Sequence, residues 1–161
     1  ENLFKKYKSV KDYAKANLKT FEADIKQTGF YKNKAKNIIS TSQQIIAKFK
    51  GKVPQTMEEL ITLPGVGRKT ANIVLTFAFD KTEGISVDTH VRRLSQRLGL
   101  SKNNDPDKIE QDLMRIIPKK DWGNFSLLII EHGRKVCLAK KPLCKKCVLK
   151  HICPSFNCFS K

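Results

Sequence analysis

The 161-residue sequence predicts an all-α fold, and three observations support that prediction. Apolar residues recur at helical spacing along much of the chain, residues that favour helix N-termini precede these stretches, and glycine or proline follows them. Strand signals do not recur. The connections are short, with no internal repeat or low-complexity linker, as in a packed helical protein.

The expected helices of the first third begin at capping residues or end at glycines. Ser9 can cap a helix that reaches about residue 17, and a second helix is expected over residues 18–29. The longest covers residues 31–50, whose apolar side chains form one core-facing stripe, made of Ile38, Ile39, Ile45, Ile46 and Phe49. Thr56 and Glu59 form a capping-box pattern that opens a helix over residues 57–63.

Four further helices are expected after a turn over residues 64–67. The one over residues 69–79 carries apolar residues almost all round, as a buried central helix does. Asp88 can cap a helix over residues 89–98, and Asp105 with Pro106 opens another that Pro118 closes. The last, over residues 122–136, leads into a cysteine-rich segment.

That segment holds four thiols within 17 residues, a density typical of a metal centre. The spacing is Cys137-x6-Cys144-x2-Cys147-x5-Cys153. Structural zinc with four thiolates usually uses two C-x2-C pairs, and only one is present. The uneven spacing favours a 4Fe-4S cluster, whose iron corners are several ångströms apart; zinc or four unligated core cysteines stay as alternatives. Cys158 falls outside the pattern.

Composition limits the class of protein. The chain has no apolar run of membrane-spanning length and no signal-peptide pattern, so we expect an intracellular protein. Free cysteines at metal-ligand spacing are typical of a reducing compartment. The chain starts at Glu1 without an initiator Met, within helical sequence, so we expect the natural N-terminus to lie further upstream.

The net charge of +17 is concentrated in two regions. Residues 1–52 carry a net +9 and residues 134–161 a net +8, whereas residues 53–133 are balanced. A solvated lysine-rich surface explains a high isoelectric point but not a neutral middle. Nucleic acid explains this distribution better than an acidic membrane surface, because no segment pairs a strong apolar face with a basic one.

The turn Leu63-Pro64-Gly65-Val66-Gly67 joins two of the expected helices. Two glycines let the backbone turn tightly, so that successive N–H groups and the next helix N-terminus can point at one anion, such as a backbone phosphate. A plain helix–helix turn is the alternative.

Three motifs together resemble the helix-hairpin-helix DNA glycosylases of the endonuclease III type. They are residues 63–71 (LPGVGRKTA), residues 87–91 (VDTHV) and the four-cysteine spacing, in this order over the whole chain. The resemblance implies a helical barrel over residues 1–118, incomplete at its N-terminus, with the helix-hairpin-helix at about residues 57–79. It implies a 4Fe-4S cluster subdomain over residues 119–161 and a family chain with roughly 50 further residues upstream.

The implied activity is base-excision repair. An oxidised pyrimidine is flipped out of duplex DNA, its glycosidic bond is cleaved, and the strand is nicked by β-elimination. Lys69 matches the nucleophile of the family, and adjacent Arg68, the helix N-terminus and burial would all favour the neutral amine that it needs. Asp88 matches the essential carboxylate, which we expect to stay ionised at a helix N-terminus and to stabilise positive charge on the sugar.

The resemblance extends to DNA contacts. Gly65, Val66, Gly67 and Arg68 would bind a phosphate, and Phe30 stands where related enzymes place an apolar wedge, an interhelical core contact being the alternative. Lys140 and Lys141, beside the cysteines, are expected to bind phosphates, with a solvated loop as the alternative. His90 and His132 are expected to be structural.

Three functional hypotheses follow. The first is a bifunctional glycosylase and lyase acting as a monomer on damaged or abasic double-stranded DNA, in the cytoplasm or nucleoid of a prokaryote or in a eukaryotic nucleus or mitochondrion. The second is a monofunctional mismatch glycosylase, which the presence of Lys69 disfavours. The third is a DNA-binding protein without catalysis.

Overall fold

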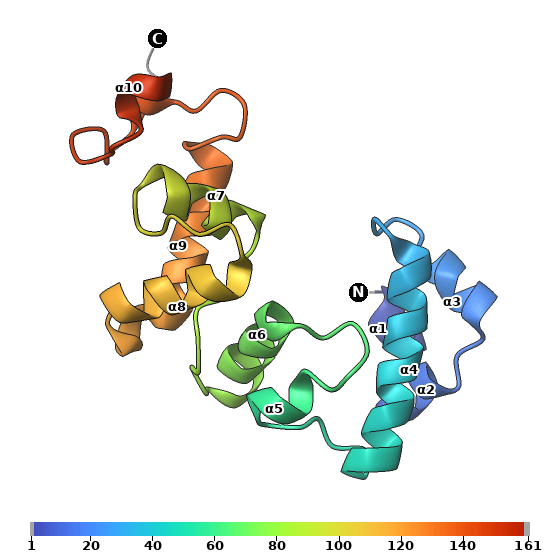
Figure 1. Cartoon of the computed structure of the whole chain (residues 1–161). Helices are drawn as coiled ribbons and strands as arrows, with labels where there is room; N and C mark the ends of the chain where they lie inside the picture. Colours follow the sequence, from blue (N-terminus) through green and yellow to red (C-terminus); the bar gives the residue numbers. More distant parts are fainter. Residues whose placement is uncertain (1, 160–161) are drawn as a thin grey trace. The chain divides into compact units, whose positions relative to one another are not determined.

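A computed structural model describes residues 2–159, and all regular structure in that range is helical (Figure 1). This confirms the predicted all-α class. The chain divides into two compact units, the first ending at Gly67 and the second beginning at Arg68. No helix within residues 2–159 is long and apolar enough to cross a membrane.

The first unit contains five helices, most of which begin where local sequence predicts. They are α1 (Asn2–Lys6), α2 (Val10–Ala14), α3 (Leu18–Asp24), α4 (Tyr31–Phe49) and α5 (Met57–Leu60). Ser9 caps α2 in a complete capping box with Asp12, and Thr56 caps α5 by accepting from the Glu59 N–H. Both α3 and α5 end earlier than expected. After each helix the chain continues in tight turns, in which a backbone N–H donates to the carbonyl three residues before it, so the α-helical hydrogen-bond pattern stops.

An aromatic cluster forms the core of the first unit. Tyr7 stacks on Tyr13 with ring centroids 5.2 Å apart, and both rings contact Phe21 edge-on. Ile25 and Ala35 complete this buried group, so α4 is held against the helices that precede it. Edge-to-face pairs add roughly 0.5–1.5 kcal/mol each to the burial of their area. The predicted α4 stripe is confirmed in part, with Ile45 buried and Ile38 and Ile39 packed on this core.

The second unit contains the remaining helices. They are α6 (Arg68–Phe79), α7 (Thr89–Arg97), α8 (Pro106–Ile116), α9 (Trp122–Lys135) and α10 (Phe156–Phe159), with short 3-10 turns at Lys119–Asp121 and Cys144–Lys146. Their common core contains Ile85, Val87, Val91, Leu94, Ile109, Leu113 and Ile129. The division expected after residue 118 therefore differs from the compact units, because Ile129 of α9 packs in the same core as α7 and α8.

Helix α6 also differs from expectation. The sequence predicted a helix buried on all sides, and Ala71, Asn72 and Leu75 are buried. Ile73 and Phe77, however, are 39% and 63% exposed within the described chain. The helix thus buries one face in its own unit and leaves an apolar face open.

Candidate functional site

Lys69 lies in the first turn of α6, at the edge of a cavity of about 250 Å³ in the second unit. Ser86, Trp122 and Ser126 also line this cavity. The Ser86 hydroxyl donates to the Lys69 carbonyl at 3.5 Å, and the Ser126 hydroxyl donates to the Ser86 carbonyl at 3.0 Å. Lys69 itself is exposed, so the expected burial is not found in the described chain.

Asp88 caps α7, as the sequence predicts. Its Oδ1 accepts from the backbone N–H groups of His90 and Val91, each at 2.8 Å, and its Oδ2 lies 3.1 Å from His90 Nδ1. Burial acts to raise the pKa of the Asp88 carboxyl group, but the bonds from Val91 and His90 outweigh it and hold the pKa below its usual value. Asp88 is therefore an anion at neutral pH, and His90 is its hydrogen-bonded partner.

Asp88 and Lys69 belong to the same unit and are connected through one short segment. Asp88 follows Ser86 by two residues, and Ser86 contacts the Lys69 backbone. The cavity beside Lys69 is lined by Ser86 and not by Asp88. The second unit thus supplies an anion held by three hydrogen bonds at the start of α7 and an exposed amine at the start of α6.

The turn over residues 63–67 closes the first unit. Gly65 has a φ of +74°, and a Cβ there would clash with the Asn37 side chain, whose Cγ would lie 2.8 Å away. The Thr41 hydroxyl donates to the Pro64 carbonyl at 2.8 Å, which ties the turn to α4. Gly67 differs from expectation, because its φ is not positive and a Cβ there would meet no atom within 4 Å. Only Gly65 is required by the geometry of the turn.

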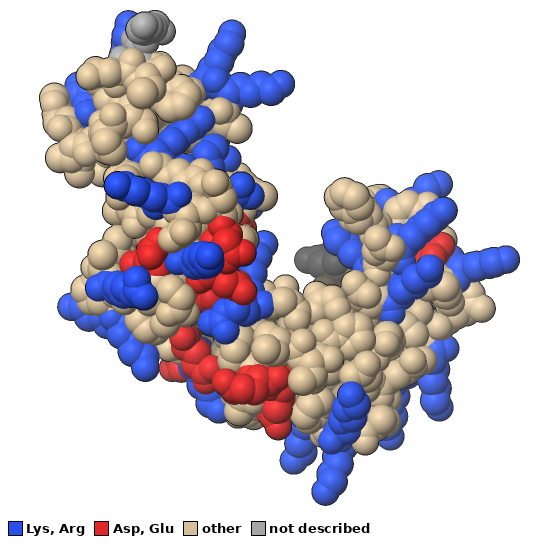
Figure 2. Space-filling model, in the orientation of Figure 1, with Lys and Arg blue, Asp and Glu red and all other residues tan. Residues whose placement is uncertain are grey.

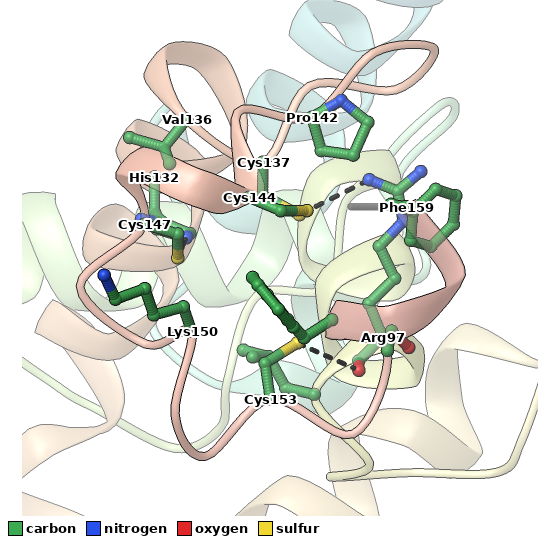
Figure 3. A pocket seen from close by; sticks show the side chains of 13 residues that line it. Arg97, His132, Val136, Cys137, Pro142, Cys144, Cys147, Lys150, Cys153 and Phe159 are labelled. Atoms are coloured by element: carbon green, nitrogen blue, oxygen red, sulfur yellow. Dashed lines mark hydrogen bonds between the residues drawn. The ribbon is translucent and has the colours of Figure 1, made fainter. Parts of the chain in front are cut away.

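The four spaced cysteines, Cys137, Cys144, Cys147 and Cys153, line one cavity of the second unit (Figure 3). None forms a disulfide, and Cys158 is exposed and does not line this cavity. Burial raises the pKa of the Cys144 thiol, and the three neighbouring thiols raise it further. No group of three or more His, Cys, Asp or Glu side chains in residues 2–159 converges as ligands of a metal ion do.

Polar hydrogens reach the sulfur atoms from several directions. Arg97 Nη1 donates to Cys137 Sγ at 3.3 Å, and the Leu149 N–H donates to Cys147 Sγ at 3.4 Å. His132 Nε2 lies 3.5 Å from Cys147 Sγ, which gives this structural histidine a place in the site. Such donors stabilise thiolate sulfur, and sequence reasoning missed Arg97 because it lies 40 residues from the first cysteine.

The remaining predicted residues lie on the surface. Phe30 is 87% exposed and has a left-handed φ of 57°, so the alternative of a core contact is wrong for the described chain. Lys140 and Lys141 are exposed, and in Figure 2 lysine and arginine side chains project from both units. These placements leave the side chains accessible to a large anionic partner.

A buried polar network beside Lys69 was not predicted. Glu110 of α8 accepts hydrogen bonds from Arg68 and Asn72, both on the first turns of α6. The sequence does contain a signal for this network, because the spacing of Glu110, Leu113, Met114 and Ile117 places the glutamate on the apolar face of its helix. A charged residue within an apolar stripe needs a buried partner.

Comparison with known proteins gives concordant results. Residues 1–119 match the model of the HhH-GPD superfamily base excision DNA repair protein. The chain is 56% identical over 153 residues to endonuclease III of Synechocystis sp., covering 95% of this chain and 70% of that protein. It is 42% identical to endonuclease III of Thermotoga maritima, covering 98% and 73%.

A solved structure is similar along nearly the whole chain. It is a trapped covalent intermediate of endonuclease III with DNA, an estranged-adenine complex. The match has a TM-score of 0.94 and 42% identity, and it covers 99% of this chain and 75% of the other.

Proposed function

The chain belongs to the HhH-GPD superfamily of base excision DNA repair proteins, and we propose that it removes oxidised pyrimidines from duplex DNA and nicks the resulting strand through a lysine Schiff base. It is a DNA glycosylase and AP lyase of the endonuclease III type. The observation that carries the proposal is the similarity to an endonuclease III captured in covalent linkage to DNA, combined with an accessible lysine two residues after the LPGVG turn.

The reaction needs an amine and an anion. The neutral Nζ of Lys69 attacks C1′ of the flipped nucleotide, the bond from C1′ to the base breaks, and the base leaves with the bonding electrons and takes up a proton. The sugar ring opens to an imine with Lys69. Loss of a C2′ proton then expels the 3′ phosphate by β-elimination, and water releases the lysine.

Asp88 serves the steps in which positive charge develops. Its carboxylate is ionised, because the backbone N–H groups of Val91 and His90 stabilise the anion against the effect of burial. A preorganised anion stabilises the cationic sugar without reorganisation during the reaction. One Oδ atom is bonded to His90 Nδ1, and proton transfers to and from the carboxylate can use this contact.

DNA is the partner, and its phosphates are bound by the basic parts of the chain. The turn over residues 65–68 binds one phosphate, and Lys140 and Lys141 bind others, so affinity falls with salt. Phe30 acts as the wedge that fills the space left by the flipped base. Its exposed ring and left-handed backbone suit that role, because nothing in the described part of its unit covers it.

The cysteine cavity binds a 4Fe-4S cluster through Cys137, Cys144, Cys147 and Cys153. An all-thiol donor set in one cavity, with N–H groups directed at sulfur, fits such a group. A single zinc ion fits less well, since structural zinc with four thiolates usually uses two C-x2-C pairs and only one is present. When bound, the cluster cross-links the C-terminal segment.

Borohydride trapping on a duplex with one abasic site tests the proposal. A lyase that works through an amine yields a stable covalent adduct, because reduction fixes the imine. A monofunctional mismatch glycosylase would release its base and leave no adduct. A binding protein without catalysis would shift the duplex in a gel and yield neither product.

A further inference from the structure

Glu110 carries a carboxylate that is almost fully buried. Its side chain is 3% exposed, and it lies on α8 beside the core residues Ile109 and Leu113. Arg68 Nε donates to Oε2 and Asn72 Nδ2 donates to Oε1, each at 2.7 Å. An unpaired charge at this depth would be strongly unfavourable, so these bonds hold Arg68 and Asn72 firmly.

A third segment closes over the network. Gly84 packs so tightly that a Cβ there would lie 2.9 Å from Asn72 Nδ2 and would clash with Glu110 Oε1. The carboxylate is thus enclosed by α6, α8 and the link between α6 and α7. Helix α6, helix α8 and the link between α6 and α7 therefore pack around the Glu110 carboxylate, and their contacts with it fix their relative positions.

The network is centred on the turn that carries Lys69. Arg68 and Asn72 are four residues apart and therefore lie on one face of α6, while Lys69 lies on the adjoining face at the cavity. The first turn of α6 contains no acidic residue of its own, so Glu110 supplies the negative charge that a helix N-terminus favours. Rotation or axial shift of this turn would move Lys69 and would break both bonds to Glu110.

We propose that Glu110 is a positioning residue, which fixes the first turn of α6 through Arg68 and Asn72 so that the Lys69 amine is presented at the reacting sugar carbon. The proposal rests on the proposed function of Lys69. Glu110 touches neither substrate nor reacting atoms, and it acts only through the orientation of α6. A displacement of about 1 Å in such an amine can slow a reaction about a hundredfold.

Glu110→Gln tests the proposal, because it keeps the volume and removes the charge. The new amide oxygen can accept from Arg68 Nε, and the new NH2 can donate to Asn72 Oδ1 once the Asn72 amide rotates, so the change removes the ion pair with Arg68 and reorients Asn72. We expect the affinity for an abasic duplex to change less than threefold and the trapping rate at saturating DNA to fall at least tenfold. The matched control is Asp112→Asn, on the same helix, where Asp112 accepts from Ser101 and Asn103.

An exchange variant separates positioning from simple stability. The double change Asn72→Asp with Glu110→Gln swaps carboxylate and amide, so that the amide at position 110 accepts from Arg68 and donates to the carboxylate at position 72. We expect it to trap within about threefold of the wild-type rate, although its melting temperature is not expected to be fully restored. If Glu110 has a purely structural role, the trapping rate of every variant that folds is expected to equal the wild-type rate, and only the melting temperature is expected to change.

The outcomes are distinguishable. Absence of trapping by the wild type overturns the proposed function, whereas normal trapping by Glu110→Gln, or equal slowing by Asp112→Asn, overturns the role of Glu110 alone. An exchange variant that stays as slow as Glu110→Gln also contradicts the proposal. If Glu110→Gln does not fold, Asn72→Ala replaces it, and an unchanged trapping rate in that variant overturns the proposal.

Discussion

Asp88→Asn separates the catalytic role of Asp88 from its role as a helix cap. In the structure Oδ1 accepts from two N–H groups at 2.8 Å, and an amide oxygen in the same place can accept from both. The loss is then the charge at the N-terminus of α7, worth about 0.3–1 kcal/mol of stability, because the amide nitrogen at the Oδ2 position can donate to His90 Nδ1 in the tautomer that carries the ring proton on Nε2. For a chain of this size that corresponds to a decrease in Tm of no more than about 4 °C.

The expected kinetic effect is much larger. Removal of one preorganised group that stabilises transition-state charge costs about 10²–10³-fold in rate. We therefore expect Asp88→Asn to bind damaged duplex like the wild type and to release the base at least a hundredfold more slowly, measured as single-turnover base release at saturating enzyme. A preformed abasic site is still expected to react slowly with Lys69, since that step does not need the bond to the base to break.

Asp105→Asn is the matched control. Asp105 caps α8 by accepting from the Lys108 N–H at 3.0 Å, so the change removes the same charge from the same kind of cap. Base release by this variant is expected at the wild-type rate. The reasoning is refuted if Asp88→Asn also releases base at the wild-type rate, or if both variants are slowed equally.

The lowered pKa of Asp88 predicts a dependence on pH as well. A carboxyl group whose folded pKa is depressed contributes stability above its unfolded pKa of about 3.9, and this contribution is lost as pH falls through the folded pKa. Asp88→Asn removes the contribution. The difference in Tm between wild type and variant is therefore expected to be constant near neutral pH and to diminish below pH of about 4.

Three further perturbations test the metal and the DNA surface. Cys147→Ala is expected to lose iron and the visible absorption of the cluster and to make the C-terminal segment sensitive to protease, whereas Cys158→Ala retains all three properties. Replacement of Lys140 and Lys141 with Ala is expected to weaken binding to damaged and undamaged duplex alike and to reduce the slope of log K against log salt by about 2. Phe30→Ala is expected to change stability by less than about 0.5 kcal/mol, because the ring is 87% exposed, and to weaken binding to flipped-base duplex by about 1–3 kcal/mol.

Each of these has a clear contrary result. One zinc and no iron by elemental analysis would contradict the assignment of the cysteine cavity. A loss confined to lesion-containing DNA would contradict phosphate binding by Lys140 and Lys141, and Lys119 with Lys120, another exposed adjacent pair, controls for the change in net charge. A large loss of stability in Phe30→Ala would contradict the wedge.

Local chemistry accounts for most of the helix boundaries that the sequence predicts. Ser9, Thr56, Asp88 and Asp105 each accept a hydrogen bond from an N–H group two or three residues ahead, and a cap of this kind depends on neighbouring residues alone. The early end of α3 was not predictable in this way. No glycine marks it, and the chain leaves the helix at Ile25 through a turn that Thr28 completes.

Contacts between distant segments explain what sequence reasoning missed. The spacing of the cysteines predicts that they share a site, but Arg97 reaches Cys137 only because α7 packs against α9. The Glu110 network joins residues 38 and 42 positions apart, which no local pattern encodes. At Gly67 the sequence predicted too much. Its place in the LPGVG motif suggested that only glycine fits the turn, but the backbone there is ordinary and has room for a Cβ.

Trapping with mass mapping tests the central claim most directly. The wild-type chain is incubated with an abasic duplex and borohydride, the adduct is digested, and the modified lysine is identified by mass. We predict one adduct per chain on Lys69, and no adduct with Lys69→Gln, which still binds the duplex. An adduct on another amine, or a wild-type rate of trapping by Lys69→Gln, would contradict the assignment of Lys69 as the nucleophile.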